Sequence, residues 1–352
     1  MEEVILTVRN LQTVFDTPSG RFAAVDGASF TLRAGEVLGI VGESGCGKTQ
    51  LSLSVLRLVP SPPGKIVAGE IIFRGRDLLQ LPEKELRQIR GNEIAMIFQE
   101  PMTSLNPVYT IGQQLIETIR LHQRLDAKAA RAQAIEMLRL VGIPRADEVV
   151  DEYPHRFSGG MRQRAMIAMA LSCRPALLIA DEPTTALDVT IQAQILELMK
   201  ELKDKIGTSI MFITHDLGVI AEMAEQVLVM YAGEVVEKAD VDTLFREPYH
   251  PYTRGLIQSR PTIEDENERL EYIEGSVPDP AHKPTGCPFH PRCPDAMEVC
   301  RVAMPPVRTV RDTHDERGEH QVRCWLHEDQ ASRHAALANT GTADAPADGV
   351  RP

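Results

Sequence analysis

The stretch from Gly42 to Thr49 constrains this chain more than any other part of its sequence. It reads GESGCGKT and matches the G-x-x-x-x-G-K-[ST] pattern of a loop that binds phosphate groups. Glycines let such a loop curl so that successive backbone N–H groups face one centre, and the following helix adds its positive N-terminal end. A strand-like run ends at Val41 and a helical pattern follows Gly47. The motif therefore predicts a nucleotide-binding α/β domain.

The residue types in this loop have separate roles in holding a nucleoside triphosphate. Lys48 is expected to bring a positive charge to the β- and γ-phosphates, and the Thr49 hydroxyl to hold Mg²⁺. At Cys46 the backbone matters more than the thiol, so we interpret this cysteine as a passive residue. A chance glycine-rich turn is the alternative. The residues expected to contact ATP here are Gly42, Glu43, Ser44, Gly45, Cys46, Gly47, Lys48 and Thr49.

Charge and hydropathy argue against several classes of function. The 352 residues include 50 acidic and 38 basic side chains, for a formal net charge of -12. General nucleic-acid-binding proteins normally carry a basic face, so we expect no nucleic-acid partner. No apolar run reaches the roughly 18 residues of a membrane-spanning helix, and the N-terminus lacks the features of a signal peptide. The sequence therefore predicts a cytosolic protein that reaches a membrane only through partners.

Short apolar runs separated by helical patterns predict the order of the elements. Continuous apolar runs are typical of the buried central strands of a parallel sheet. Strands are expected at residues 4–8, 28–32, 37–41, 70–73, 94–98, 177–180 and 210–213, with a closing hairpin at 227–236. Helical spacing follows Gly47 and covers residues 111–143. Prolines between residues 248 and 261 predict a domain boundary.

Polar residues follow two of these predicted strands. Asp181, at the end of the run 177–180, can hold Mg²⁺ through its water shell, and Glu182 can polarise the water that attacks the γ-phosphate. The alternative is a strand that ends at the surface in two solvated acids. His215 closes the strand at 210–213, where a structural histidine is the commoner interpretation.

The segment 157–164, FSGGMRQR, comes directly before a helical pattern. Its simple interpretation is a helix N-cap, with Ser158 as the capping residue and glycines in the turn. The sharper interpretation is a second anion-binding helix end that holds the γ-phosphate of a nucleotide bound by another subunit. The residues concerned are Ser158, Gly159 and Gly160.

These motifs, in this order, resemble the nucleotide-binding subunits of ABC transporters over about residues 4 to 260. The resemblance implies a P-loop NTPase fold with a helical subdomain in residues 1–260. It implies that Phe15 stacks on adenine and that Gln99 reaches Mg²⁺ and senses a transmembrane partner. The implied magnesium ligands are Thr49, Gln99 and Asp181, and the implied catalytic residues are Glu182, His215 and Gln99.

The same resemblance assigns one group of residues to a neighbouring subunit's nucleotide. Ser158 and Gly160 would contact ATP on the opposing subunit, and Asp188 would bridge the two subunits. Phe157 replaces the Leu that is usual in this family, and Met161 replaces the usual Gln. The glycines that donate backbone N–H groups are kept, so we expect the site to work.

Three further segments resemble the oligopeptide, dipeptide and nickel importer branch of the family. They are QEPMTSLNP at 99–107, YHPYT at 249–253 and GCPFHPRC at 286–293. The resemblance implies peptide uptake with a second related ATPase subunit, two permease subunits and an external binding protein. It places the chain on the cytoplasmic face of the inner membrane. Nickel or glutathione uptake, a soluble ABC ATPase acting on ribosomes or DNA, and a redox-sensing module are the alternatives.

Four of the six cysteines gather in a C-terminal region, residues 261–328, with the spacing C-x5-C-x6-C-x23-C. They are Cys287, Cys293, Cys300 and Cys324. Four thiolates suffice for zinc or an iron–sulfur cluster, and some relatives carry a [4Fe–4S] cluster at such a tail. We favour that cluster over Zn²⁺ and over unliganded cysteines, and interpret His290 and His327 as packing residues. Residues 329–352 are expected to be disordered.

Overall fold

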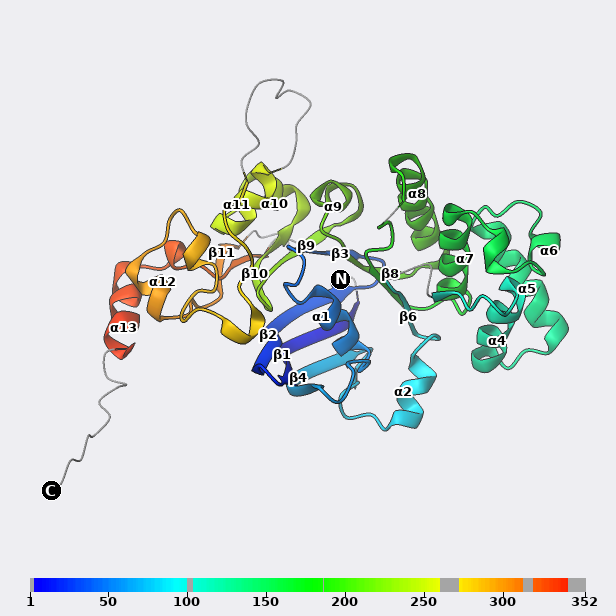
Figure 1. Cartoon of the computed structure of the whole chain (residues 1–352), viewed down its shortest axis with the longest axis horizontal. Helices are drawn as coiled ribbons and strands as arrows, with labels where there is room; N and C mark the ends of the chain where they lie inside the picture. The colour runs from blue at the N-terminus through cyan, green and yellow to red at the C-terminus, as the bar shows by residue number, and fades with distance from the viewer. Residues whose placement is uncertain (1–2, 100–103, 186, 260–271, 313–318, 341–352) are drawn as a thin grey trace.

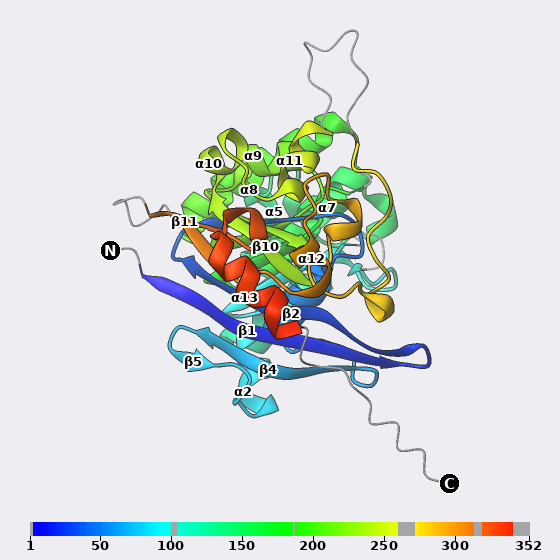
Figure 2. The ribbon, with the colours of Figure 1, turned by 90° about the vertical axis from the view of Figure 1, so that its left-hand side faces the viewer.

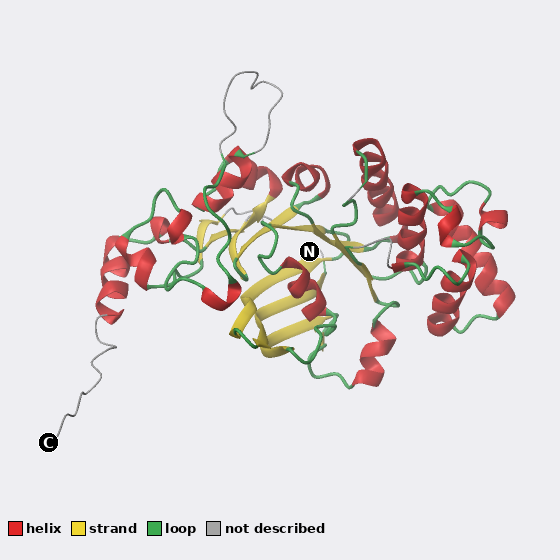
Figure 3. Cartoon of the chain, in the orientation of Figure 1, coloured by secondary structure: helices red, strands yellow, loops and turns green. Residues whose placement is uncertain are grey.

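The computed structural model of the chain describes residues 3–99, 104–185, 187–259, 272–312 and 319–340. Within these ranges the strands form a four-stranded sheet, in the order β2-β1-β4-β5, and an eight-stranded sheet, in the order β11-β12-β10-β9-β3-β8-β7-β6. Helices flank the larger sheet, while the smaller one lies beside α1 (Lys48–Val55) (Figures 1 and 3). The predicted α/β class is therefore confirmed.

The smaller sheet is antiparallel and is formed mainly by the N-terminal residues. Its strands are β1 (Val4–Thr17), β2 (Gly20–Arg33), β4 (Gly64–Phe73) and β5 (Arg76–Asp77). β1 and β2 run well beyond the predicted apolar runs because register shifts, such as that between Val8 and Leu11, absorb the residues that interrupt the alternation. Figure 2 shows this sheet packed below the larger one.

The larger sheet has parallel strands at its centre, as its apolar runs predicted. These strands are β3 (Val37–Val41), β6 (Ile94–Ile97), β7 (Leu177–Asp181), β8 (Ser209–Ile213) and β9 (Gln226–Tyr231). All residues of β3, β7 and β8 are buried, as expected for a sheet covered on both faces. β9 and β10 (Glu234–Asp240) pair antiparallel and form the predicted closing hairpin.

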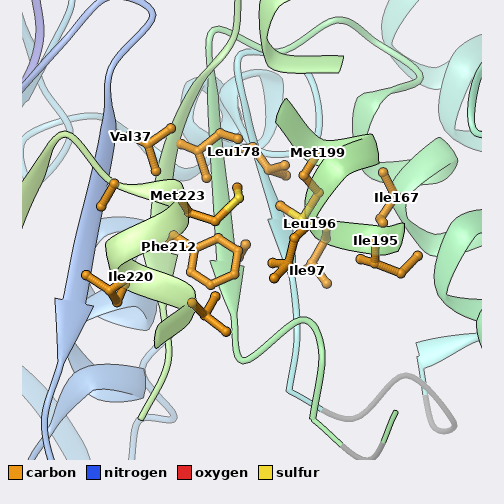
Figure 4. Packing of buried hydrophobic residues seen from close by; sticks show 14 of the residues in the cluster. Val37, Ile97, Ile167, Leu178, Ile195, Leu196, Met199, Phe212, Ile220 and Met223 are labelled. Carbon is orange, nitrogen blue, oxygen red and sulfur yellow. The ribbon is translucent and has the colours of Figure 1, made fainter. Parts of the chain in front are cut away.

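Alternate residues of the central strands enter two different cores. Val37 and Phe212 face the core that contains α8 (Val189–Ile206) and α9 (Leu217–Met223), where Figure 4 shows Leu196, Met199 and Met223 packed around them. Their strand neighbours Leu38 and Met211 face the other core, shared with α1 and the smaller sheet. The ends of these strands, and the loops that leave them, are thus held from both sides.

A helical part lies beyond the β6 edge of the sheet (Figure 1). Its helices are α4 (Ile111–Gln123), α5 (Ala127–Leu140), α6 (Ala146–Val149), η1 (Pro154–Arg156) and α7 (Gly159–Leu171), and α2 (Glu83–Ile89) precedes them in the chain. The predicted helical stretch 111–143 is split because Arg124 adopts a left-handed backbone and Asp126 caps a new helix. Within the described ranges, we find no helix with the length and apolar character needed to cross a bilayer.

The C-terminal region joins the larger sheet and packs against its β10 edge. β12 (Glu319–Val322) pairs with β10 and with β11 (Arg308–Asp312). The other elements of this end are α10 (Val241–Arg246), α11 (Pro251–Gln258), η2 (Pro280–His282), η3 (His290–Arg292), α12 (Glu298–Val302), η4 (Trp325–His327) and α13 (Gln330–Thr340).

The predicted disorder of residues 329–352 is wrong for Gln330–Thr340, which forms α13. The polar composition of this tail concealed two local features. Asp329 accepts a hydrogen bond from the Ser332 N–H at 2.7 Å, as an N-cap does, and Arg333 donates to the carbonyls of Trp325 and Leu326. Residues 341–352, which are part of the same prediction, lie outside the described residues.

Candidate nucleotide-binding site

The loop from Gly42 to Thr49 connects β3 to α1, as its sequence predicted. Gly42, Gly45 and Gly47 have φ of 153°, 82° and 105°, in the region that side chains rarely adopt. A Cβ at Gly47 would collide with the Ala24 carbonyl. Lys48, which is 5% exposed, donates to the carbonyls of Gly42 and Glu43 at 2.7 and 3.1 Å. The loop therefore curls around its lysine.

The N-terminus of α1 has no side-chain cap. Its N-cap residue is Gly47, which has no side chain that could accept from the first backbone N–H groups of the helix. These donors, together with the positive end of the helix, face the curl of the loop. This is the arrangement that binds a phosphate group.

A cavity of about 350 Å³ opens over this loop. Phe15 and Phe22 form one side of the cavity, with ring centroids 5.7 Å apart and planes 14° apart, because β1 and β2 pair them directly. Phe15 is half-buried, so its ring is accessible to a flat ligand. The remaining lining comes from Ala23, Ala24, Ser44, Gly45, Gly47, Lys48, Thr49, Gln50, Gln99, Glu182, Ala232, Gly233 and Pro280. Of the predicted loop contacts, Gly42, Glu43 and Cys46 do not line it.

Asp181 ends β7 beside the loop and is 1% exposed. Burial raises the pKa of its carboxyl, a hydrogen bond from Thr49 opposes that rise, and the charge of Glu182 adds to it. Its Oδ1 atom has no hydrogen-bond partner among the described residues. A buried carboxylate oxygen without a partner, next to a threonine hydroxyl, fits the ligand set that Mg²⁺ prefers.

Glu182 lies one residue beyond the strand and has a left-handed backbone, with φ of 47°. Its N–H donates to the Ile213 carbonyl at 2.9 Å, which fixes this strained residue at the edge of the sheet. The side chain accepts hydrogen bonds from Gln99 Nε2 and Thr185 Oγ1, each at 3.0 Å, and lies 3.3 Å from His215 Nδ1. The alternative of two solvated surface acids is therefore wrong, since both carboxylates have defined environments.

These partners keep Glu182 ionised. Burial alone would raise the pKa of its carboxyl, but the hydrogen bonds from His215 and Thr185 and the nearby charge of Lys48 outweigh it, so the pKa lies below its usual value. A carboxylate in this state is an acceptor that can orient a water molecule. The predicted residues Thr49, Gln99, Asp181, Glu182 and His215 thus come together around one end of the loop.

The signature residues lie elsewhere. Ser158 is the N-cap of α7, where its hydroxyl accepts from the Met161 N–H at 3.3 Å, and Asp188 caps α8 through the Ile191 N–H at 2.9 Å. Ser158, Gly159 and Asp188 are exposed, and none of them lines the cavity of their own chain. This placement fits both interpretations of segment 157–164: a helix N-cap, and a helix end that contacts the nucleotide of another subunit.

Several site residues escaped the sequence analysis. Phe22 follows from the strand register, which the turn at Pro18–Gly20 between two β-type runs could have suggested. Thr185 is three residues after Glu182 in the sequence, but it belongs to no motif that would have marked it. Tyr252 and Arg292 belong to the segments YHPYT and GCPFHPRC, yet both contact Glu43 of the loop. Nothing in either segment indicates that contact.

The four C-terminal cysteines are free thiols, and all except Cys293 are buried. The pKa of Cys287 is raised to about 12, mainly by burial and in smaller part by the charges of Cys300, Cys324 and Cys293, so the thiols lie within electrostatic range. They do not converge on a ligand point, because among the described residues no group of three or more His, Cys, Asp or Glu side chains is arranged to hold a metal ion. The predicted [4Fe–4S] or zinc site therefore has no support in this geometry.

Comparisons with known proteins match the two ends of the chain separately. Residues 25–185 match the family model described as "ABC transporter", and residues 236–300 match "Oligopeptide/dipeptide transporter, C-terminal region". The chain is 53% identical to the oligopeptide transport ATP-binding protein AppD of Bacillus subtilis, over 93% of this chain and 98% of that protein. It is 50% identical to the dipeptide transport ATP-binding protein DppD of the same organism, over 96% and 98%.

Solved structures resemble the ATPase part. The ATP-binding cassette MJ0796, determined as a dimer in a post-hydrolysis state with ADP and Pi, superposes with a TM-score of 0.60 at 26% identity. The match covers 67% of this chain and 98% of that one. The protein cbiO1 from Clostridium perfringens, part of the ABC transporter complex cbiONQ, also gives 0.60, at 27% identity over 70% and 92% of the two chains.

Proposed function

The chain belongs to the ATP-binding proteins of ABC transporters, in the oligopeptide/dipeptide branch, and from this premise we propose that it hydrolyses ATP to drive peptide import. The observation that carries the proposal is the meeting of Lys48, Asp181, Glu182 and Gln99 around one phosphate-binding loop. Fold alone would not carry it, because related folds host many activities.

Binding begins with the loop. The uncapped N–H groups of α1 and the Lys48 ammonium would hold the phosphate chain, and Phe15 would stack on the base. Thr49 and Asp181 would hold Mg²⁺, which neutralises charge that develops on the phosphate oxygens.

Hydrolysis needs an oriented water molecule. Glu182 is ionised and held by three side chains, so its carboxylate would accept a hydrogen bond from the water that attacks the γ-phosphate. Gln99 and His215 would keep this carboxylate aimed at the phosphate end of the site. Because Gln99 donates to the Glu182 carboxylate, a shift of Gln99 would change the orientation of Glu182.

The exposed end of α7 completes the site of a second subunit in this proposal. Ser158, Gly159 and Gly160 line no part of the cavity of their own chain, so the hydroxyl and the glycine N–H groups would face a second subunit. We propose that they contact ATP on a related ATPase subunit, that Asp188 bridges the pair, and that two permease subunits and an external binding protein complete the importer. The chain would then lie on the cytoplasmic face of the membrane.

The [4Fe–4S] cluster and its zinc alternative stay predictions from the cysteine spacing. The mechanism above does not use a metal in the C-terminal region, because the described residues are not arranged to ligate one. The iron and zinc content of anaerobically purified protein tests both predictions. Protein without either metal would contradict them and leave the ATPase function untouched.

Reconstitution tests the function itself. We expect the chain to purify with two permeases and, in proteoliposomes with the binding protein, to drive ATP-dependent uptake of a labelled dipeptide or pentapeptide. Uptake of nickel or glutathione in place of either peptide would favour those substrates. Association with ribosomes or DNA instead of permeases would favour the soluble ATPase, and an ATPase rate that follows thiol oxidation would favour the redox-sensing module.

A further inference from the structure

Glu43, the second residue of the phosphate-binding loop, is held by Tyr252 of α11 and by Arg292 of the C-terminal region. Its backbone N–H donates to Tyr252 Oη at 2.8 Å, and its carboxylate Oε2 accepts from Arg292 Nη1 at 2.9 Å. Arg292 and Glu43 are 249 residues apart in sequence. The arginine side chain is only 7% exposed and that of Glu43 is 27% exposed, so the pair is largely shielded from solvent. A shielded, charge-assisted hydrogen bond is stronger than a surface ion pair.

The guanidinium of Arg292 is fixed on its other sides. Its Nε and Nη2 atoms donate to the backbone carbonyls of Glu274, Ile273 and Gly275 at 2.9, 3.2 and 3.4 Å, and Nη1 also reaches Tyr231 Oη at 3.4 Å. A planar group with five donors is suited to such a junction. Arg292 therefore joins the segment after residue 272, the end of β9 and the phosphate-binding loop at one point.

Aromatic packing holds the same junction. Tyr231, Tyr252 and Phe289 contact one another edge-on or tilted, with ring centroids 4.7 to 5.4 Å apart. All three rings are at most 2% exposed. They come from β9, α11 and the residue directly before η3, so the C-terminal region cannot shift without disturbing the Tyr252 contact to the loop.

A second contact reaches the base side of the cavity. Pro280 of η2 lines the cavity together with Phe15 and Phe22, and Lys283 lies 3.9 Å from Asp26 of β2. The C-terminal region thus approaches the nucleotide site from two directions, at the phosphate end through Arg292 and at the aromatic end through Pro280.

We propose that Arg292 is a positioning residue of the nucleotide site, which it completes from within the same chain by fixing and neutralising Glu43. The proposal rests on the ATPase function proposed above. Three glycines with positive φ make the loop intrinsically flexible, so outside contacts must hold its N–H groups toward one centre. An unpaired Glu43 carboxylate would also repel the negative phosphates.

A double-mutant cycle tests this role in the full chain. Arg292→Gln should weaken equilibrium binding of MgATP about tenfold and raise the KM of the assembled complex by a similar factor, with kcat within about twofold, because the contact is made equally in ground and transition states. Glu43→Gln should change binding by less than about threefold. Adding Arg292→Gln to Glu43→Gln should then have little further effect, since the charge to be neutralised is gone.

Two further variants separate positioning from general stability. Arg308→Gln removes another arginine of the C-terminal region, which lies on the outermost strand β11 and pairs with Glu328 at 3.3 Å, and it should leave MgATP binding unchanged. Arg292→Lys keeps the charge and should recover part of the affinity. If Arg292→Gln fails to fold, the double-mutant cycle can be measured with Arg292→Lys and Glu43→Gln instead.

Each outcome decides the proposal. A lower melting temperature with unchanged KM in Arg292→Gln, or effects of the two substitutions that simply multiply, would overturn it. Failure of the wild-type complex to hydrolyse ATP would instead refute the proposed function. Normal wild-type turnover together with wild-type-like Arg292→Gln would refute only the role of Arg292.

Discussion

Two helix N-termini, those of α1 and α7, carry the motifs that predict phosphate binding, but the chain treats them differently. The first turn of α1 follows Gly47 without a side-chain cap and lies in the cavity with Gln99 and Glu182. The first turn of α7 is capped by Ser158, is exposed at Ser158 and Gly159, and lines no part of that cavity. One end is a prepared binding site, and the other is satisfied by its own side chain.

Because of this difference, a single chain offers a complete phosphate-binding loop but only part of what hydrolysis requires. The backbone donors at the N-terminus of α1 are available for phosphate, and the acids proposed to act on it lie beside them. At α7 only the backbone glycines and one hydroxyl are offered, without an acid or a lysine nearby in the motif. We therefore expect ATP binding to depend mainly on the α1 site and hydrolysis to depend on both.

The strongest challenge to this comparison is the loss of Glu182. Glu182→Gln should keep MgATP binding and lower turnover about 10³-fold, near 4 kcal/mol, because the amide cannot act as the anionic acceptor for water. Steady-state hydrolysis by the assembled complex, measured beside equilibrium nucleotide binding, checks both halves of this expectation. Hydrolysis at the wild-type rate would remove Glu182 from its catalytic role.

The next largest effect is expected at α7. Ser158→Asp keeps an N-cap, since Asp caps as well as Ser, but places a negative charge where a partner's phosphate would lie. Turnover of the complex should fall about 10²-fold, near 3 kcal/mol, while MgATP binding by the isolated chain stays within about twofold.

Asp126→Ser is the matched control for that substitution. It exchanges the same two residue types at the N-cap of α5, away from either site, and should leave turnover unchanged. An isolated chain that hydrolyses ATP at the full rate, with or without Ser158→Asp, would show that α7 has no role across a subunit boundary.

The sequence could predict most of the α1 site because its residues form a contiguous motif or end a buried strand. The loop, Asp181, Glu182 and His215 all lie where apolar runs stop, and strand ends in a parallel sheet meet at one edge. The central strands were predicted for the same reason. β3 (Val37–Val41) carries no polar side chain, and β7 (Leu177–Asp181) is apolar until its final residue, Asp181. At these strand ends, a pattern visible over a few residues of sequence also determines where the side chain lies in the fold.

The rest of the site depends on contacts that no short pattern encodes. Arg292 reaches Glu43 because β12 joins the edge of the sheet and Phe289, directly before η3, packs on Tyr231 and Tyr252. The cysteine spacing indicated proximity, and the thiols do influence one another's pKa, but spacing does not determine whether side chains converge on one point. Likewise, the helix Gln330–Thr340 depends on its cap and on Arg333 rather than on apolar periodicity.

Acid should weaken the junction that supports the α1 site. His250 is 1% exposed, and its Nδ1 accepts from the Tyr252 N–H at 3.0 Å, which requires an unprotonated nitrogen. The pKa of His250 is lowered to about 4, mainly by burial; the charge of Glu237 opposes this shift, and the charges of His327 and Arg254 add to it. Between about pH 6.5 and pH 4 the unfolded chain therefore binds a proton that the folded chain does not.

The expected loss in the free energy of unfolding is about 2 kcal/mol between pH 7 and pH 5. Urea unfolding at several pH values measures it. His250→Asn provides the control, since its amide oxygen can cap α11 without titrating, and its profile should be flatter over this window. Parallel profiles for the two proteins would show that His250 does not supply this pH dependence.

The smallest effect should separate the two roles of Asp188, which caps α8 through Ile191, the residue that lies beside Gly160 of α7. Asp188→Asn keeps a capping side chain and removes only the charge, so the free energy of unfolding should change by less than about 0.5 kcal/mol. If Asp188 also bridges two subunits, turnover of the complex should fall about fivefold, because a charged hydrogen bond across the boundary becomes a neutral one. Asp188→Ala should lose the cap too, at about 1 kcal/mol of stability. Full turnover in Asp188→Asn with reduced stability in Asp188→Ala would show that this aspartate is only a helix cap. The proposed role of α7 between subunits would then lack support from Asp188.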